Sequence, residues 1–183
     1  FSTDGGLTFV NETVAGSANE KALAYRLRGK ADLGELTGGA LSGGLDGYYE
    51  FREAGFSALD GESLDDVQTF GASAYVDISD EARLRIALEG KRIGSNSDHL
   101  RAKAEFEAEV AENWTLLAGV ALTRFREPAK EHYNGDAVDI GARLTYKVDE
   151  DTSVYAFGQA TVVRKGDRLR NDRIGVGAET RLT

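Results

Sequence analysis

Apolar and polar residues alternate along most of this chain, so that every second position has the same character. In three segments one parity is apolar, reading Phe70, Ala72, Ala74, Val76 and Ile78, then Ala102, Ala104, Phe106, Ala108 and Val110, then Ile140, Ala142, Leu144, Tyr146 and Val148. The other parity is polar. Successive side chains on a strand point to opposite sides, so this pattern predicts strands that form a sheet with one apolar and one charged face.

The same alternation on both sides of the turns predicts about ten strands. They are expected at residues 7–14, 21–33, 41–53, 67–78, 84–93, 100–110, 116–125, 137–148, 154–164 and 173–182. Their connections alternate between short turns, such as those at 78–84 and 148–154, and longer polar loops, such as those at 54–66 and 165–172. The predicted fold is an all-β, up-and-down antiparallel transmembrane β-barrel, formed by a single domain over residues 1–183.

Composition narrows the classes of protein that fit this pattern. The chain has no run of the roughly 20 apolar residues that a spanning helix needs, and its net charge of -9 argues against nucleic acid as a partner. It contains no Cys, which excludes disulfides and thiolate metal sites. We expect neither a metal nor another cofactor. The chain begins at Phe1 and contains no Met, which indicates a mature chain or a segment excised from a longer protein.

The apolar parity is thin, because Ala and Gly supply much of it, and a soluble barrel needs bulkier residues to fill a core. We therefore expect the apolar face to point outward to lipid and the charged face to line a lumen, where mixed charges are paired or hydrated. The residues expected to line the lumen are Arg26, Arg28, Lys30, Glu50, Arg52, Arg83, Arg85, Glu89, Lys91, Arg101, Lys103, Glu105, Glu107, Glu109, Asp139, Arg143, Lys147, Glu179 and Arg181.

Two further groups of residues are expected at the edges of the apolar band. Aromatic residues near the short turns are expected to lie at the lipid interface, and they are Tyr75, Trp114 and Tyr146. Basic residues at the rim formed by the long loops concentrate positive charge, and they are Arg164, Lys165, Arg168, Arg170 and Arg173. Such a rim suits contact with lipopolysaccharide phosphates, although an ordinary solvated loop fits equally well.

Glycines recur on the charged parity, at Gly71, Gly141 and Gly175. A missing side chain there is expected to leave space for long neighbours such as Arg143. Tyr155 and Phe157 also lie on this parity, where we expect them to fill the interior.

The repeated hairpins, such as Phe70-Gly-Ala-Ser-Ala-Tyr-Val-Asp-Ile-Ser-Asp-Glu-Ala-Arg-Leu-Arg-Ile, resemble those of bacterial outer-membrane β-barrel proteins. The resemblance covers nearly the whole chain and names no subfamily. It implies the outer membrane of a Gram-negative bacterium, periplasmic short turns, surface-exposed long loops, and partners among outer-membrane lipid and lipopolysaccharide. Members of that family usually end on a strand with a terminal aromatic residue, whereas this chain ends at Thr183. Either the last strand is atypical, or the chain is a segment of a longer barrel or multidomain surface protein, with further strands or domains of the same protein or a partner protein.

Three functions remain open at this stage. The first is a non-enzymatic barrel with a structural, anchoring or narrow porin-like transport role, because about ten strands leave little interior space. The second is an outer-membrane hydrolase that resembles omptins and uses Asp98 with His99 or Asp136 with His132, or a weaker pair of Ser95 or Ser97 with His99. The third is a soluble meander β-barrel whose apolar face points inward around a small ligand.

Overall fold

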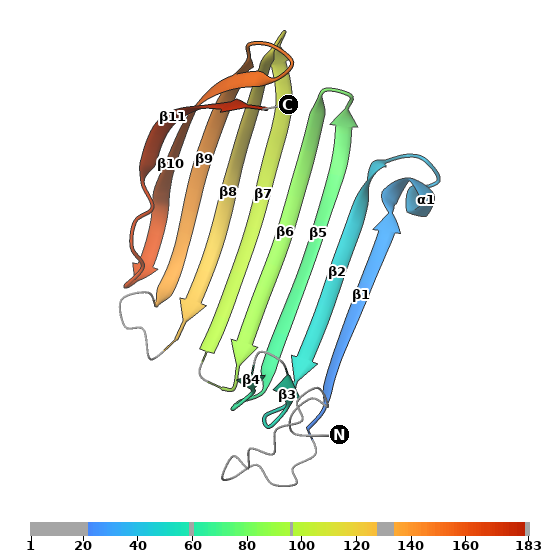
Figure 1. Cartoon of the computed structure of the whole chain (residues 1–183), viewed down its shortest axis with the longest axis vertical. Coiled ribbons are helices and arrows are strands. Elements are labelled where there is room, and N and C mark those ends of the chain that lie inside the picture. Colours follow the sequence, from blue (N-terminus) through green and yellow to red (C-terminus); the bar gives the residue numbers. More distant parts are fainter. Residues whose placement is uncertain (1–21, 59–60, 96, 128–133, 182–183) are drawn as a thin grey trace.

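The protein is a single curved antiparallel sheet, seen in a computed structural model that describes residues 22–58, 61–95, 97–127 and 134–181 (Figure 1). The nine strands of this sheet are β1 (Ala24–Asp32), β2 (Ser42–Arg52), β5 (Val67–Ser79), β6 (Ala82–Ile93), β7 (Ser97–Ala111), β8 (Trp114–Arg126), β9 (Gly135–Lys147), β10 (Thr152–Gly166) and β11 (Arg173–Thr180). Each strand pairs with its neighbour in the chain, in the order β1-β2-β5-β6-β7-β8-β9-β10-β11. The prediction of an all-β, up-and-down sheet is confirmed.

Nine of the ten predicted strands are present, and the one expected at residues 7–14 lies outside the described residues. The short turns gather at one end of the sheet and the long loops at the other (Figure 1). In the described part of the chain β1 and β11 do not pair with each other, so the sheet has two free edges.

Two small elements occupy connections between the predicted strands, one in a predicted short turn and one in a predicted long loop. The helix α1 (Leu33–Thr37) begins after Asp32, whose carboxylate accepts a hydrogen bond from the Glu35 N–H at 3.1 Å, and it ends at Gly38 in the left-handed conformation. A short hairpin, β3 (Ser57–Ala58) with β4 (Gly61–Glu62), lies in the loop between β2 and β5. Neither covers a face of the sheet (Figure 1).

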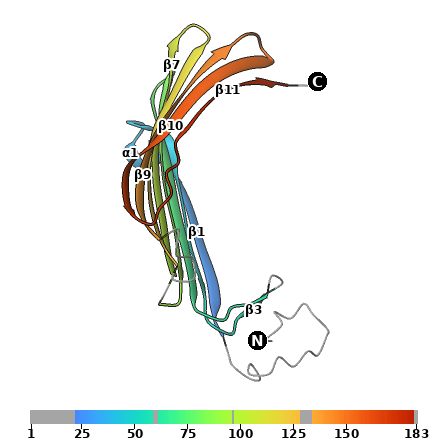
Figure 2. The ribbon, with the colours of Figure 1, turned by 90° about the vertical axis from the view of Figure 1, so that its left-hand side faces the viewer.

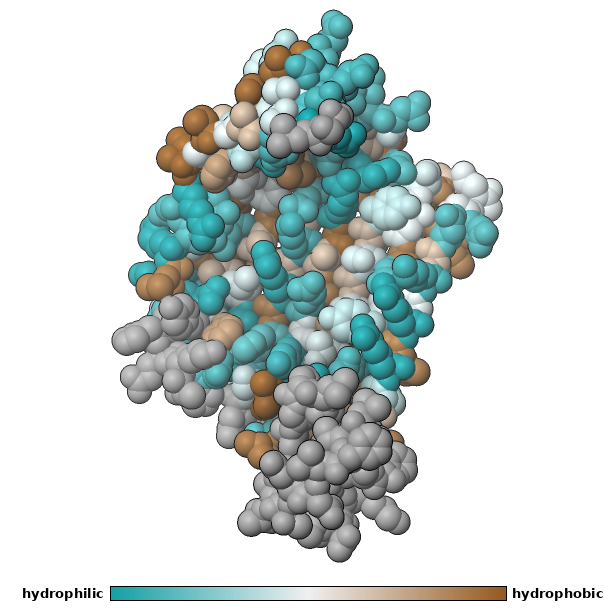
Figure 3. Space-filling model, viewed as in Figure 1, coloured by the Kyte–Doolittle hydropathy of each residue, from teal (hydrophilic) through white to brown (hydrophobic). Residues whose placement is uncertain are grey.

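The sheet is one layer thick and bends along its strands (Figure 2). Hydrophilic residues predominate over the middle of its concave side, which faces the viewer in Figure 3. The pairing register places the residues of the charged parity on this concave face and the apolar parity on the convex face. The curvature therefore puts the charged side chains inside the bend, as the sequence predicts for a lumen.

A conventional core is missing from the described residues. Ala137 is their only buried apolar side chain and Thr161 their only buried polar one. Large apolar residues on the convex face are exposed instead, and they include Leu27, Leu45, Ile86, Leu88, Phe106, Leu122, Ile140, Leu144, Val154, Ile174 and Val176. Apolar surfaces of this extent are unusual on soluble monomers and are typical of sites that interact with proteins or membranes.

Packing on the convex face predicts a difference between two glycines in its strands. A Cβ built on Gly90 would overlap the ring of Phe70 on the neighbouring strand, whereas one built on Gly158 meets nothing within 4 Å. We expect Gly90→Ala to force the ring aside and to lower the free energy of unfolding by about 1–3 kcal/mol. Gly158→Ala is the matched control and should leave that free energy unchanged or slightly higher, as measured by urea titration. Equal effects of the two variants would contradict this packing.

Candidate functional site

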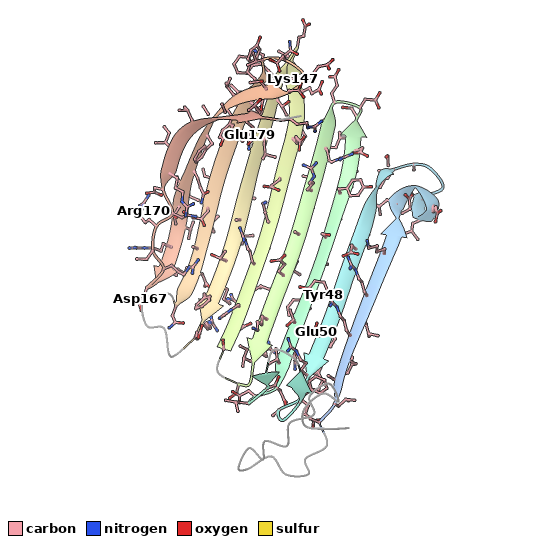
Figure 4. The ribbon with its side chains drawn as sticks, viewed as in Figure 1. Tyr48, Glu50, Lys147, Asp167, Arg170 and Glu179 are labelled. Carbon is pink, nitrogen blue, oxygen red and sulfur yellow. The ribbon has the colours of Figure 1, made fainter. Side chains whose placement is uncertain are left out.

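The concave face carries the charged residues that the sequence assigns to a lumen. Across neighbouring strands the register sets Arg26 opposite Glu50, and Glu89 opposite Arg101. Every one of the predicted lumen residues within the strands falls on this face by the same register. Figure 4 shows Tyr48 and Glu50 on β2 and Glu179 on β11, which belong to it. Opposite charges on adjacent strands therefore lie side by side.

Ion pairs connect many of these charges. The nitrogen-to-oxygen distance is 3.2 Å between Arg28 and Asp46, 2.6 Å between Lys103 and Glu105, and 3.0 Å between Arg143 and Glu179. Arg85 pairs with Glu107 in the same way. All of these side chains remain at least partly exposed, and such pairs contribute about 0–1 kcal/mol each to stability. Their main effect is to orient the side chains along a hydrated surface.

Aromatic rings cover several glycines of the concave face, which corrects the expectation for Gly71 and Gly175, whereas Gly141 has Gln159 beside it. The ring of Tyr48 lies over Gly71, that of Phe157 over Gly175, and that of Tyr155 over Gly177. The sequence predicts that long basic neighbours would use this space. The structure places rings there, because a flat ring packs against bare backbone. Tyr155 and Phe157, which looked out of place on a charged face, thus cover β11.

Cations lie over two of these rings, Tyr48 and Tyr155, and over the ring of Tyr75. The guanidinium carbon of Arg143 is 3.9 Å from the centre of the Tyr155 ring, and that of Arg26 is 5.6 Å from Tyr48. The guanidinium carbon of Arg83 is 5.0 Å from the centre of the Tyr75 ring.

The predicted place of Tyr75 at the lipid interface is wrong. Tyr75 has the parity of Asp77 and Ser73, and it packs over Gly44 on the concave face.

Two aromatic clusters lie on the convex face, one at each end of the apolar band. Trp114 and Tyr146 face outward at the short-turn end as predicted, with ring centres 4.9 Å apart. At the long-loop end the ring centre of Tyr25 lies 5.9 Å from that of Tyr49 and 5.6 Å from that of Phe51. This second cluster was missed by the sequence reasoning, although its residues share the apolar parity. Aromatic residues at both margins of an apolar band are typical of membrane barrels.

The concave face is hollowed near the C-terminal strands. An open groove of about 760 Å³ lies over β7 to β11, and its basic lining residues are Arg101, Lys103, Arg143, Arg168 and Arg173. Glu105 and Asp139 are its acidic lining residues. A smaller hollow of about 310 Å³ adjoins it towards the long loops, with Arg101 and Arg168 common to both. These two residues stand where the hollows meet.

The segment of residues 167–172, between β10 and β11, closes one side of the groove and is called here the strap. It is held by Thr161, which is 5% exposed. The Thr161 hydroxyl donates to Asp139 at 2.5 Å and accepts from the Asn171 N–H at 2.8 Å, and the Thr161 N–H donates to Asp172 at 2.8 Å. The strap is thereby fixed to the concave side of β10.

Charge pairing within the strap strengthens this arrangement. A hydrogen bond from Arg170 holds the pKa of the Asp172 carboxyl below its usual value, with a further contribution from the Thr161 N–H. A lowered pKa means that the carboxylate favours the folded strap at neutral pH, and that this contribution is lost as the pH falls through the lowered value.

Three basic residues of the predicted long-loop rim lie on the concave side of the sheet. Arg168 turns inward, where it donates to the Thr123 hydroxyl at 3.2 Å, and Arg173 lines the groove. The register shifts between Thr161 and Val163, and this bulge brings Arg164 opposite Ala137 on the concave face. These basic residues therefore do not gather on the convex side of the sheet.

The first of the predicted hydrolase pairs, Asp98 with His99, does not form. Asp98 and His99 are successive residues of β7, so their side chains point to opposite faces. Asp136 instead pairs with Arg124 at 3.1 Å, and His132 lies outside the described residues.

The weaker pairing of Ser97 with His99 does form, but its geometry differs from that of a catalytic triad. Ser97 Oγ lies 3.3 Å from His99 Nε2, and Glu127 Oε2 lies 3.5 Å from the same nitrogen. A triad needs the nucleophile and the acid on different ring nitrogens. The His99 ring is stacked on Phe125 with a centre distance of 3.9 Å, which favours a packing role.

Among the residues that the structure describes, no group of three or more His, Cys, Asp or Glu side chains is arranged to hold a metal ion. No helix in the same residues is long and apolar enough to cross a membrane. Comparison of the chain with known protein families, with curated proteins and with solved structures found no match.

Proposed function

We propose that this chain forms the wall of a β-barrel in the outer membrane of a Gram-negative bacterium, with a narrow lumen that passes small charged solutes. In this proposal the convex face contacts lipid and the concave face contacts water. One observation carries the proposal: a nine-stranded sheet presents an uncovered apolar face on its convex side and a charged face on its concave side.

The arrangement of the apolar band supports a lipid contact. Aliphatic residues such as Leu122 and Ile140 occupy the middle of their strands, and the two aromatic clusters lie near the ends. Aromatic side chains favour the boundary between hydrocarbon and water, whereas aliphatic ones favour the hydrocarbon itself. This distribution along the strands matches the layers of a bilayer.

Backbone hydrogen bonding requires that such a sheet be closed. In hydrocarbon each unpaired N–H or C=O group costs several kcal/mol, so a sheet edge cannot face lipid. We propose that the edges of β1 and β11 pair with further strands that close the barrel.

The curvature argues against a soluble barrel around an apolar ligand, which needs the apolar face inside the bend. It also disfavours a second copy as the cover, because two convex surfaces touch only along a narrow strip. A hydrolase is disfavoured by the separation of Asp98 from His99. An anchoring role without transport is compatible with the same wall.

Detergent dependence and heat modifiability test the proposal. The chain is purified with and without detergent, unboiled and boiled samples are compared on a gel, and detergent-folded protein is placed in planar bilayers. We expect a detergent-requiring species whose mobility shifts on boiling and which gives small, discrete conductance steps. A shift without conductance would support the anchoring role and overturn transport. A monomer that stays in solution without detergent would overturn the membrane proposal as a whole.

A further inference from the structure

We propose that the groove over β7 to β11 is a binding site for a small multivalent oxyanion, in particular a phosphate-bearing solute, held by Arg101, Arg168 and Arg173. This inference deepens the proposed function and rests on it in one respect, namely that the concave face is open to water. It begins from the imbalance of charge in the groove, where five basic side chains meet two acidic ones.

Both acidic side chains of the groove are already engaged by neighbours. Lys103 Nζ lies 2.6 Å from Glu105 Oε1. Asp139 accepts the hydroxyl hydrogen bond of Thr161 at 2.5 Å. Among the basic residues Arg143 pairs with Glu179 at 3.0 Å and stacks on Tyr155. No described carboxylate lies within ion-pair distance of Arg101, Arg168 or Arg173, so their charge is available to a ligand.

Arg168 supplies a second, independent observation. Its Nη2 donates to Thr123 and its guanidinium lies 6.0 Å from the Phe125 ring, yet its Nε is buried and has no hydrogen-bond partner within the described residues. A buried donor without a partner costs free energy, so native proteins rarely keep one without a functional reason. Within the described residues the hydrogen bonding of the Arg168 guanidinium is therefore incomplete.

The charge along the concave face changes sign from one end to the other. The hollow of about 310 Å³ at the long-loop end adds Lys91 to Arg101 and Arg168, against Glu89 alone. The hollow of about 230 Å³ at the short-turn end is acidic, with Asp77, Asp80, Glu81, Glu107 and Glu109 against Arg83 and Arg85. A cleft lined by one sign of charge concentrates ions of the opposite sign. An anion is therefore drawn to the long-loop half of the face.

The chemistry of the lining defines the ligand class. A guanidinium presents paired N–H donors that match the oxygens of a phosphate or carboxylate. The volume of about 760 Å³ lies in the range of small-molecule sites and far below that of a macromolecular interface. The groove also opens on the concave side, away from the apolar face. A free solute fits these conditions better than a lipid headgroup does.

Calorimetric titration of the full chain with inorganic pyrophosphate tests the inference. The protein is kept in zwitterionic detergent at low ionic strength, where screening is weak. We expect saturable binding that weakens with added salt, and at least a tenfold loss of affinity in the double variant Arg101→Gln with Arg168→Gln. Arg85→Gln is the control, because Arg85 lies on the same face but pairs with Glu107 outside the groove. It should leave the affinity unchanged.

Three outcomes would overturn the inference: no saturable binding by the wild-type protein, equal losses in the double and control variants, or loss of pyrophosphate binding when anionic lipid is added to the micelles. The last would assign the arginines to a headgroup. If the double variant does not fold, the single variant Arg173→Gln, on edge strand β11, is titrated instead and should also bind pyrophosphate more weakly than the wild type. Because binding is measured without a bilayer, its failure is distinguishable from failure of the proposed function, which the detergent requirement and conductance decide.

Discussion

Replacing Ala118 by arginine is expected to block insertion of the chain into lipid bilayers, whereas the same replacement at Ala121 is expected to be tolerated. The two alanines lie three residues apart on β8 and on opposite faces. Ala118 is opposite Phe106 and Ala142 on the convex face, and Ala121 is opposite Lys103 and Asp139 on the concave face. An arginine on the lipid side near the middle of a strand costs about 2–4 kcal/mol, whereas one facing a hydrated, mixed-charge surface does not.

The measurement is the fraction of protein that folds into vesicles, read from the unboiled gel band across a urea series. Ala118→Leu controls for the change in size without the charge and should fold like the wild type. Equal folding of the two arginine variants, or poorer folding of Ala121→Arg, would contradict the assignment of the faces.

Replacing Thr161 by valine is expected to release the strap from β10. Valine has nearly the same shape, but it removes the hydroxyl that joins Asp139 to the Asn171 N–H. Leaving a nearly buried acceptor and donor unpaired costs about 1–3 kcal/mol for each group. We expect a lower urea midpoint and cleavage by trypsin after Arg168 or Arg170 that is at least several-fold faster.

Thr161→Ser provides the matched control, because it keeps the hydroxyl and loses only a methyl group. It should retain most of the protease resistance of the wild-type strap. If the serine and valine variants are cleaved at the same rate, then packing rather than the hydrogen bonds holds the strap, and the position of Arg168 in the groove would not depend on Thr161.

The strands and their two faces were predictable because strict alternation has only one structural meaning over several turns. The register places Arg83, Lys103 and Arg143 on one face as their parity requires. Tyr75 was misplaced for the opposite reason. Its aromatic ring near a short turn suggests the lipid interface, but parity decides the face on which a strand side chain lies, and the parity of Tyr75 is that of the charged residues.

Features that depend on packing between strands were not predictable. The bulge between Thr161 and Val163 moves Arg164 to the other face, and no local residue pattern indicates it. The inward strap depends on contacts of Thr161 with residues up to 22 positions away. The aromatic cover over Gly71 depends on the register that sets Tyr48 opposite this glycine, and alternation within a single strand does not fix that register.

Accessibility of single cysteines along β9 tests most directly whether the two faces meet lipid and water. The chain contains no Cys, so each cysteine introduced at positions 140 to 144 is the only thiol. In vesicles we expect a water-soluble maleimide to label positions 141 and 143, which share the concave face, and to spare positions 140, 142 and 144 until the protein is unfolded. Uniform labelling, or labelling of the even positions alone, would contradict the proposal that the convex face contacts lipid.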